Sequence, residues 1–204
     1  MTEARPWLVV VGGINGAGKS TFAESLAQDP SLVGAVFLNP DHAISAVLAA
    51  DPSKSRRAAD FGGLRAVSLE LGRLLAARKS LIAETVFANE AYFRLIRRAK
   101  GFGYAVRLVF VGVPTVEDAI ERVAARVTKG GHDVRESDIR RRWPIAHTNL
   151  ARAVPMVDEV LVLSNSGYGA KPAVVAVAKA GEITLLDPNA LPAVTAVLVP
   201  LIGP

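Results

Sequence analysis

The sequence predicts an α/β fold in which a parallel β-sheet carries helices on both faces. Short segments rich in Val, Leu and Ile alternate along the chain with longer segments whose apolar residues recur at helical spacing. One short segment, residues 105–111, is almost continuously apolar, as expected of a strand buried in a parallel sheet. Strands that alternate with helices are joined by right-handed crossovers. We therefore expect a sheet of about five parallel strands with helices on both faces, followed by a C-terminal β-hairpin.

A glycine-rich sequence lies between the first strand and the first helix. The apolar residues 7–11 precede Gly13-Ile14-Asn15-Gly16-Ala17-Gly18-Lys19-Ser20, which matches the P-loop pattern G-x-x-x-x-G-K-[ST]. Its backbone N–H groups can cradle an anion, Lys19 can reach the β- and γ-phosphates, and the Ser20 hydroxyl can bind Mg²⁺. A helix follows, so its N-terminus adds a favourable dipole for phosphate. The predicted nucleotide-binding residues are Gly13, Asn15, Gly16, Ala17, Gly18, Lys19, Ser20 and Thr21.

The later elements are placed by the same periodicities and by turn residues. Further strands are expected at residues 35–38, 81–85, 105–111 and 159–163, and further helices at 43–50, 64–78, 92–100, 115–129 and 137–151. Asn89 and Thr115 are expected to cap two of these helices. Residues 173–177 and 183–186 flank a glycine turn and predict the terminal hairpin, within about 172–187. No internal repeat is visible, so residues 1–204 are expected to form a single domain.

The composition excludes several classes of protein. The chain has 204 residues, of which 50% are hydrophobic and 21% charged, and this is too apolar for a disordered protein. Cysteine is absent, which excludes disulfides and cysteine zinc sites and fits a cytoplasmic location. The first six residues lead directly into a strand, so no signal peptide is expected. The late apolar stretch 191–202 contains two prolines and is too short to span a bilayer.

The net charge of +5 and the pI of 9.8 suit an anionic ligand. The arginines nevertheless occur as separate short clusters, at Arg56-Arg57, Arg97-Arg98 and Arg140-Arg141-Arg142. Only 6% of the residues are aromatic, and no stacking pattern accompanies the clusters. The sequence therefore does not favour a nucleic-acid partner.

Three polar residues lie where two predicted strands end, at the same edge of the sheet as the P-loop, where ligands of such folds bind. Asp41 follows the second strand, and its position allows two interpretations: a helix N-cap, or a base that accepts the proton of a substrate hydroxyl. Glu84 ends an apolar strand, where a carboxylate that served no site would be costly. Thr85 lies beside it. We expect Glu84 and Thr85 to contact substrate.

Two helices rich in arginine offer positive charge for a phosphate. Arg122 and Arg126 are four residues apart and share a helix face. Asp118 can pair with Arg122, which makes Arg126 the better phosphate ligand. The side chains at 140–142 cannot all point the same way, so one of the three is expected to enter the site. Residues 115–150, with a glycine joint at 130–131, can then form a lid over phosphates.

Taken together, these motifs resemble the zeta-toxin group of P-loop kinases in its short bacterial form. The resemblance runs through the segments 12–21, 39–41, 84–85, 107–112, 122–126, 130–134, 139–142 and 163–167. It implies an ATP- or GTP-dependent kinase that uses Mg²⁺, with an antitoxin protein among its partners. In zeta toxins the substrate is a UDP-activated amino sugar, which is phosphorylated on its 3-hydroxyl.

The resemblance also implies roles for individual residues. Lys19 and Ser20 would hold phosphates and Mg²⁺, Asp41 would be the catalytic base, and Glu84 would help to place the substrate. Arg126 and Arg140 would clamp the transferring phosphate. Two alternatives remain open: a kinase of nucleosides or polynucleotide ends, and a non-catalytic protein that uses a bound nucleotide as a switch.

Overall fold

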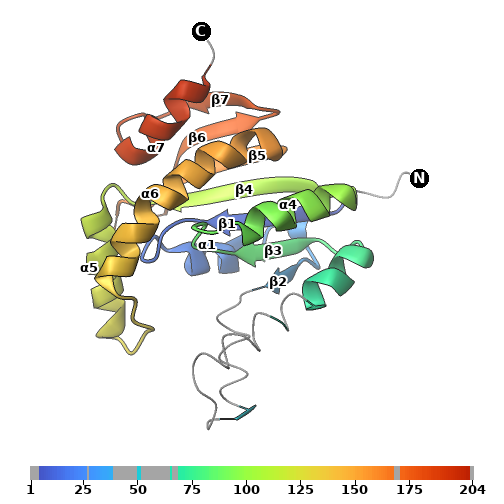
Figure 1. Cartoon of the computed structure of the whole chain (residues 1–204), viewed down its shortest axis with the longest axis horizontal. Coiled ribbons are helices and arrows are strands. Elements are labelled where there is room, and N and C mark those ends of the chain that lie inside the picture. The colour runs from blue at the N-terminus through green and yellow to red at the C-terminus, as the bar shows by residue number, and fades with distance from the viewer. Residues whose placement is uncertain are drawn as a thin grey trace.

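The computed structural model describes residues 5–26, 28–38, 50–51, 65, 69–167 and 171–202. Their strands form one seven-stranded sheet in the order β2-β3-β1-β4-β5-β6-β7 (Figure 1). The first five strands in the chain run parallel, and the last two are antiparallel to their neighbours. The strand bounds are β1 Trp7–Gly12, β2 Val36–Leu38, β3 Leu81–Glu84, β4 Ala105–Gly112, β5 Glu159–Ser164, β6 Ala173–Lys179 and β7 Glu182–Leu185.

The predicted α/β class and the C-terminal hairpin are confirmed, but the expected sheet of about five strands is too small. The hairpin is not a separate appendage, because β6 pairs with β5 and extends the sheet to seven strands. Burial explains this pairing, since Val175, Ala176 and Ala178 of β6 pack into the core. Ala180 and Gly181 join β6 to β7 with positive φ angles of 52° and 87°, as a tight hairpin turn requires.

The helices lie where the apolar periodicity predicted them, with one addition. Residues 69–76 are helical within the predicted 64–78 helix, whereas the predicted 43–50 helix lies outside the described residues except for Ala50. A short helix near the C-terminus, which begins at Pro192, was not among the expected helices. The helix bounds are α1 Lys19–Leu26, α4 Ala91–Gly101, α5 Val116–Val127, α6 Glu136–Ala153 and α7 Pro192–Leu198, with the 3₁₀ turns Pro30–Leu32, Val154–Met156 and Val199–Leu201.

Both capping predictions concern the first turn of a helix. Thr115 caps α5 in a capping box, since its side chain accepts from the Asp118 N–H while Asp118 accepts from the Thr115 N–H. Asn89 lies one residue before the N-cap position of α4, which is Glu90. Its Oδ1 accepts from the Ala91 N–H at 2.9 Å, so it forms an Asx turn rather than the cap itself.

Two hydrophobic clusters fill the opposite faces of the sheet. Along β1, Leu8 and Val10 belong to one cluster, and Val9 and Val11 belong to the other. The helices α4 and α7 cover the first face, and α1 and α5 cover the second (Figure 1). Helix α6 contributes to both, because Ile139 near its start packs with α5 while its later residues pack with the first cluster. Residues on α6 therefore reach two different parts of the molecule.

No helix among the described residues combines the length and the apolar composition needed to cross a bilayer.

A buried histidine on α6 makes the stability of the fold depend on pH. The His147 side chain is 4% exposed and lies between the rings of Phe110 and Trp143, whose centroids are 5.5 Å and 4.5 Å away. Its Nδ1 is 2.7 Å from the Trp143 carbonyl oxygen, so Nδ1–H donates to this oxygen when the ring is neutral. Burial lowers the pKa of His147, and the fold therefore favours the neutral imidazole.

We expect the free energy of unfolding to decrease as the pH falls below about 6.5, because the unfolded chain then binds a proton that the folded chain resists. The slope contributed by one such group is at most about 1.4 kcal/mol per pH unit. Urea unfolding at several pH values between about 5.5 and 7.5 measures it. His147→Gln is the control and should flatten this part of the profile; identical slopes for both proteins would contradict the prediction.

Candidate functional site

The P-loop forms the turn between β1 and α1. Gly13, Gly16 and Gly18 have φ angles of 141°, 85° and 91°, which side chains rarely allow. Space is also limited: a Cβ atom at Gly13 would lie 2.1 Å from the Val111 carbonyl oxygen, and one at Gly16 would lie 2.3 Å from that of Ala119. The loop is therefore packed between β4 and α5, and its shape depends on glycine at these positions.

The lysine of the P-loop is folded back over the loop. Lys19 is the first residue of α1 and is only 7% exposed, and its Nζ donates to the Ile14 carbonyl oxygen at 3.0 Å. An ammonium group carries three N–H donors, and this one lies within the phosphate-binding loop. Its contact with β- and γ-phosphates stays a prediction.

The P-loop serine meets the carboxylate at the end of the neighbouring strand. Val11 of β1 pairs with Glu84 of β3 in the parallel register, which brings the two strand ends together. The Ser20 hydroxyl donates to Glu84 Oε1 at 2.9 Å. A hydroxyl and a carboxylate are hard oxygen ligands of the kind that Mg²⁺ prefers, so this pair fits the metal that a P-loop implies. The Glu84 carboxylate therefore lies against Ser20, and its expected contact with substrate stays a prediction.

Thr85 is directed into its own turn. Its side chain is 6% exposed, and its Oγ1 accepts from the Phe87 N–H at 2.8 Å. Its backbone N–H continues the pairing with β1 by donating to the Val11 carbonyl oxygen at 2.9 Å. The geometry therefore ties Thr85 to the turn after β3, and its predicted contact with substrate stays a prediction.

The three consecutive arginines of α6 point to different partners. Arg140 bridges the two helices of the predicted lid: it donates to Glu136 of α6 and to Glu117 of α5, both at 2.8 Å. Arg142 instead reaches the P-loop, where its Nη1 donates to Asn15 Oδ1 at 3.1 Å. The geometry thus brings Arg142 to the site, and it does not support the phosphate role expected for Arg140.

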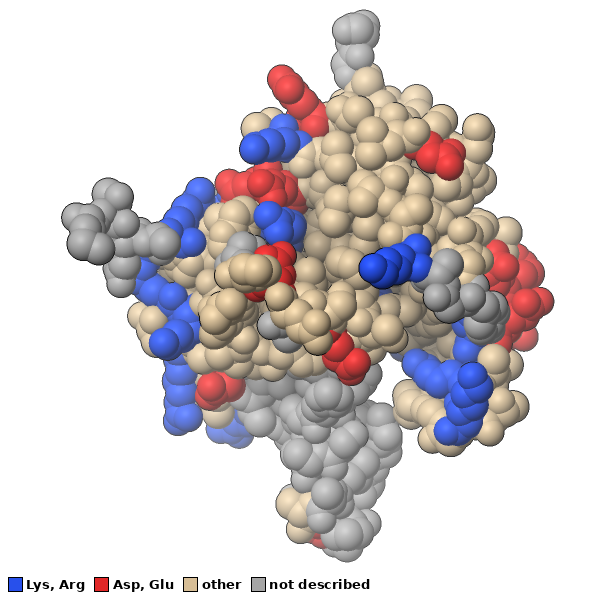
Figure 2. Space-filling view, turned by 180° about the vertical axis from the view of Figure 1, so that it is seen from behind, with Lys and Arg blue, Asp and Glu red and all other residues tan. Residues whose placement is uncertain are grey.

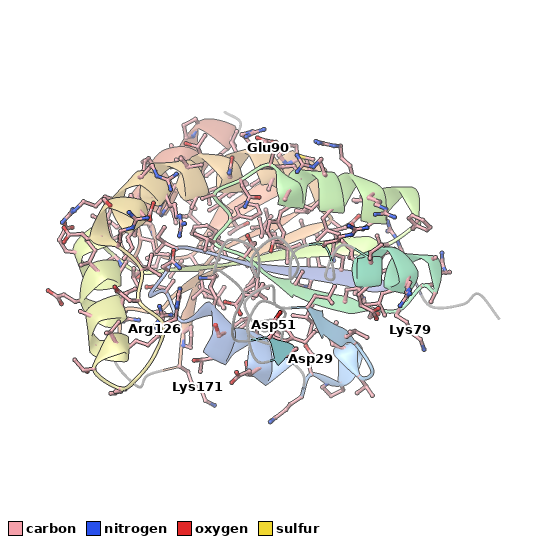
Figure 3. All side chains as sticks on the ribbon, turned by 60° about the horizontal axis from the view of Figure 1, so that its bottom comes forward. Asp29, Asp51, Lys79, Glu90, Arg126 and Lys171 are labelled. Atoms are coloured by element: carbon pink, nitrogen blue, oxygen red, sulfur yellow. The ribbon has the colours of Figure 1, made fainter. Side chains whose placement is uncertain are left out.

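Arg126 lies at the end of α5, beside the connection to α6 (Figure 3). Its guanidinium donates to the His132 carbonyl oxygen, and a Cβ atom at Gly131 would lie 2.4 Å from Arg126 Cγ. The side chain is exposed and packs on the glycine joint of the predicted lid. No contact between Arg126 and the P-loop is present among the described residues, so its role as a phosphate clamp remains a prediction.

Asp41 and its neighbour His42 lie outside the described residues. The geometry therefore does not distinguish between the two interpretations of Asp41, and its assignment as the base rests on the sequence.

Sequence reasoning gave no role to Asn165, which lies directly after β5. Its Nδ2 donates to the Ala17 carbonyl oxygen at 2.8 Å, and its backbone N–H donates to that of Gly112 at 2.9 Å. The amide packs so closely that a Cβ atom at Gly18 would lie 2.4 Å from Asn165 Nδ2. The signal that would have found it is a polar residue at the carboxyl end of a buried strand, the criterion that selected Glu84.

The charged side chains agree with the separate clusters seen in the sequence. On the face shown in Figure 2, Lys and Arg gather along the left margin of the molecule and in smaller groups elsewhere, with Asp and Glu near several of them. Charged side chains of opposite sign also pair in the structure, as in the 2.8 Å contact of Lys100 with Asp158 and the 2.7 Å contact of Arg107 with Glu159.

Comparison with solved structures agrees with this architecture. The complex of AvrRxo1-ORF1 with AvrRxo1-ORF2, determined with ATP, is similar with a TM-score of 0.70 and 17% identity, covering 94% of this chain and 64% of that one. This chain thus spans less than two thirds of that protein. The PezAT toxin–antitoxin system of Streptococcus pneumoniae is similar with a TM-score of 0.57 and 13% identity, covering 81% and 70%. These likenesses show a P-loop kinase-like fold.

Comparison at the sequence level identifies the family. An uncharacterized protein of Haemophilus influenzae is 28% identical over 131 residues, which cover 64% of this chain and 88% of that protein. Residues 8–142, which run from β1 through the P-loop to Arg142, match the profile AAA_33, described as an AAA domain. This match extends over well more than half of the sequence, and the chain therefore belongs to the AAA_33 family of AAA domains.

Proposed function

We propose that the protein is a nucleotide-dependent kinase that transfers a phosphoryl group from ATP or GTP to a hydroxyl group of a small metabolite. The observation that carries this proposal is the meeting of the P-loop with a carboxylate, Ser20 with Glu84 at 2.9 Å, beside a buried lysine. Membership of the AAA_33 family and the fold shared with the ATP complex of AvrRxo1-ORF1 support it.

Phosphoryl transfer needs a phosphate cradle, positive charge and a group that orients the attacking hydroxyl. In this proposal the P-loop and Lys19 hold the phosphates, Ser20 and Glu84 hold Mg²⁺, and Asp41 accepts the proton of the hydroxyl. Mg²⁺, when bound, neutralises negative charge on the phosphates. The lid at 115–150 supplies arginine, and its closure excludes water from the site.

Arg142 is the arginine of α6 that the geometry favours for contact with phosphate, since it is the one that reaches the P-loop. Arg142→Ala should lower the transfer rate by about 100-fold or more, as expected when a donor to the migrating group is lost. Arg140→Ala is the matched control on the same helix, and it should reduce the rate only a few-fold because Arg140 pairs with two surface glutamates. Equal losses in steady-state rate measurements would contradict this assignment.

We further propose that the acceptor is a UDP-N-acetyl amino sugar, as the resemblance to zeta toxins implies and as the fold shared with PezAT supports. The test is a transfer assay with γ-labelled ATP, Mg²⁺ and UDP-N-acetylglucosamine, beside a reaction without acceptor. Label on the sugar nucleotide would establish this acceptor. Binding of ATP without such label would retain the P-loop and would direct the search to other hydroxyl compounds.

A second candidate is a kinase of nucleosides or polynucleotide ends. It is supported by a likeness to a chain in the Pnkp1/Rnl/Hen1 RNA repair complex, with a TM-score of 0.56 and 19% identity, covering 74% of this chain and 47% of that one. It predicts that oligonucleotides compete with the acceptor for the site, and that their affinity falls steeply as the salt concentration rises. A nucleotide-binding switch, the third candidate, would bind ATP tightly and transfer phosphate to no acceptor.

The partner and the location are part of the same proposal. AvrRxo1-ORF1 was determined with a second protein, and PezAT is described as a toxin–antitoxin system. We propose that this chain likewise binds an antitoxin-like protein and acts in the cytoplasm as one P-loop kinase domain.

A further inference from the structure

The turn after β3 is held by a side chain from α6, and we propose that Asn149 is a positioning residue for the Ser20–Glu84 pair. This proposal rests on the proposed function, because it concerns how the same metal-binding pair is built. Its parts are a strained residue in the turn, a buried amide that holds it, and a backbone connection to Glu84.

The strained residue is Phe87. Its φ angle is +61°, in the left-handed region that aromatic residues rarely adopt, and its side chain is 1% exposed. Its ring packs on the end of β1, where a Cβ atom at Gly12 would lie 3.2 Å from Phe87 Cγ. Such a conformation persists only where its surroundings impose it, and strained residues of this kind cluster at functional sites.

Two hydrogen bonds impose the conformation of Phe87. Its backbone N–H donates to Thr85 Oγ1 at 2.8 Å, and its carbonyl oxygen accepts from Asn149 Nδ2 at 3.0 Å. The first bond is local to the turn, whereas the second comes from a helix 62 residues further along the chain. Asn149 is therefore the hydrogen-bond donor through which α6 holds the turn.

The Asn149 amide has one defined orientation. It is 4% exposed, and its Oδ1 accepts from Arg152 Nη1 at 2.9 Å, so its NH₂ group faces Phe87. Arg152 is itself held by Glu90 at 2.8 Å and lies 4.4 Å from the centroid of the Phe93 ring. A buried amide with both ends bonded in this way rigidifies the elements that it joins.

The conformation of this turn also determines the position of Glu84. Glu84 precedes Thr85, and its carbonyl oxygen accepts from Tyr92 Oη at 2.6 Å, so its backbone is held on both sides of the turn. Its carboxylate contacts Ser20 from this backbone. Since Arg142 reaches the P-loop from the same helix as Asn149, α6 supports the site at two points.

The test measures metal binding directly. Asn149→Asp and Asn149→Leu both remove the donor to Phe87, and they differ in charge. In the wild-type protein with ATP, Mn²⁺ binding is followed by the electron paramagnetic resonance signal of free Mn²⁺. We expect both variants to weaken Mn²⁺ binding by about 10-fold to 100-fold, as for other groups that orient metal ligands. Their affinity for ATP in EDTA should stay within about 2-fold of wild type, because the P-loop is unchanged.

Thr148→Ala is the matched control, since Thr148 is the exposed neighbour of Asn149 on α6 and its replacement leaves the bond to Phe87 intact. It should bind Mn²⁺ like the wild type. Wild-type affinity for Mn²⁺ in both Asn149 variants would overturn the proposal. So would a loss of ATP affinity in EDTA as large as the loss of Mn²⁺ affinity, or the absence of a folded state for both variants in thermal unfolding. Wild-type protein that bound Mn²⁺ and ATP yet transferred phosphate to no acceptor would refute the proposed function alone.

Discussion

Lys19→Ala should reduce phosphoryl transfer by about 100-fold to 1000-fold or more, the loss expected when a charged group that stabilises the transition state is removed. Lys19 is the cation placed within the P-loop, 7% exposed and 3.0 Å from the Ile14 carbonyl oxygen. Without it, negative charge that develops on the phosphates has no compensating ammonium group. The affinity for ATP should fall as well, because the same group binds the phosphates of the ground state. Steady-state rates and an equilibrium titration with ATP measure the two effects.

Lys79→Ala is the matched control for this variant. Lys79 is exposed and lies before β3, at the opposite edge of the sheet from the P-loop (Figure 3). Its replacement should leave both the rate and the affinity unchanged. If the Lys19 variant transferred phosphate at the wild-type rate, the P-loop would have no catalytic role and the proposed function would lose its main support.

The part of the site that was predictable from sequence is the part that is local in the chain. The P-loop, its flanking strand and its helix are specified within about twenty residues, because the glycine spacing encodes the turn itself. The parallel order of the sheet then implies that Glu84 and the P-loop share an edge. The contact of Glu84 with Ser20 agrees with this shared edge, although the sequence led us to expect a contact of Glu84 with substrate.

The orientation of the arginines needed the packing of α6. Consecutive residues on a helix point about 100° apart, so the side chains at 140–142 had to diverge. The buried residues Ile139 and Ala146 define the inner face of α6, and Arg142 lies three residues after one and four before the other. This spacing places Arg142 on the inner face. The same periodicity continues to Asn149, so the sequence held a signal for both residues.

Two features could not be derived from local pattern. An alternating pattern describes a detached hairpin as well as one that extends a sheet, and only the burial of Val175 and Ala178 decides between them. The strain at Phe87 depends on Asn149, 62 residues away. The helix α7 lies in the apolar stretch 191–202, which was considered only as a membrane span; Pro192 occupies its first turn, where proline is favourable.

Asp41→Asn should lower turnover by about 100-fold to 10,000-fold while the affinity for ATP stays close to wild type. If Asp41 is the base, the side-chain amide of asparagine cannot replace it as the acceptor of the hydroxyl proton. The affinity for ATP should be retained, because a base of this kind contacts the acceptor hydroxyl and not the nucleotide. The substitution also separates the two interpretations of this residue. Asparagine caps helices as well as aspartate does, so a cap would survive the change.

The measurements are the transfer rate, the ATP affinity and the thermal unfolding of the same preparation. Glu182→Gln is the control for the loss of one negative charge. It is the same carboxylate-to-amide change, on β7, the last strand in the order of the sheet. A large loss of turnover without a loss of stability identifies Asp41 as the base. Turnover that persists in Asp41→Asn assigns Asp41 to helix capping, and the hydroxyl would then require a different proton acceptor.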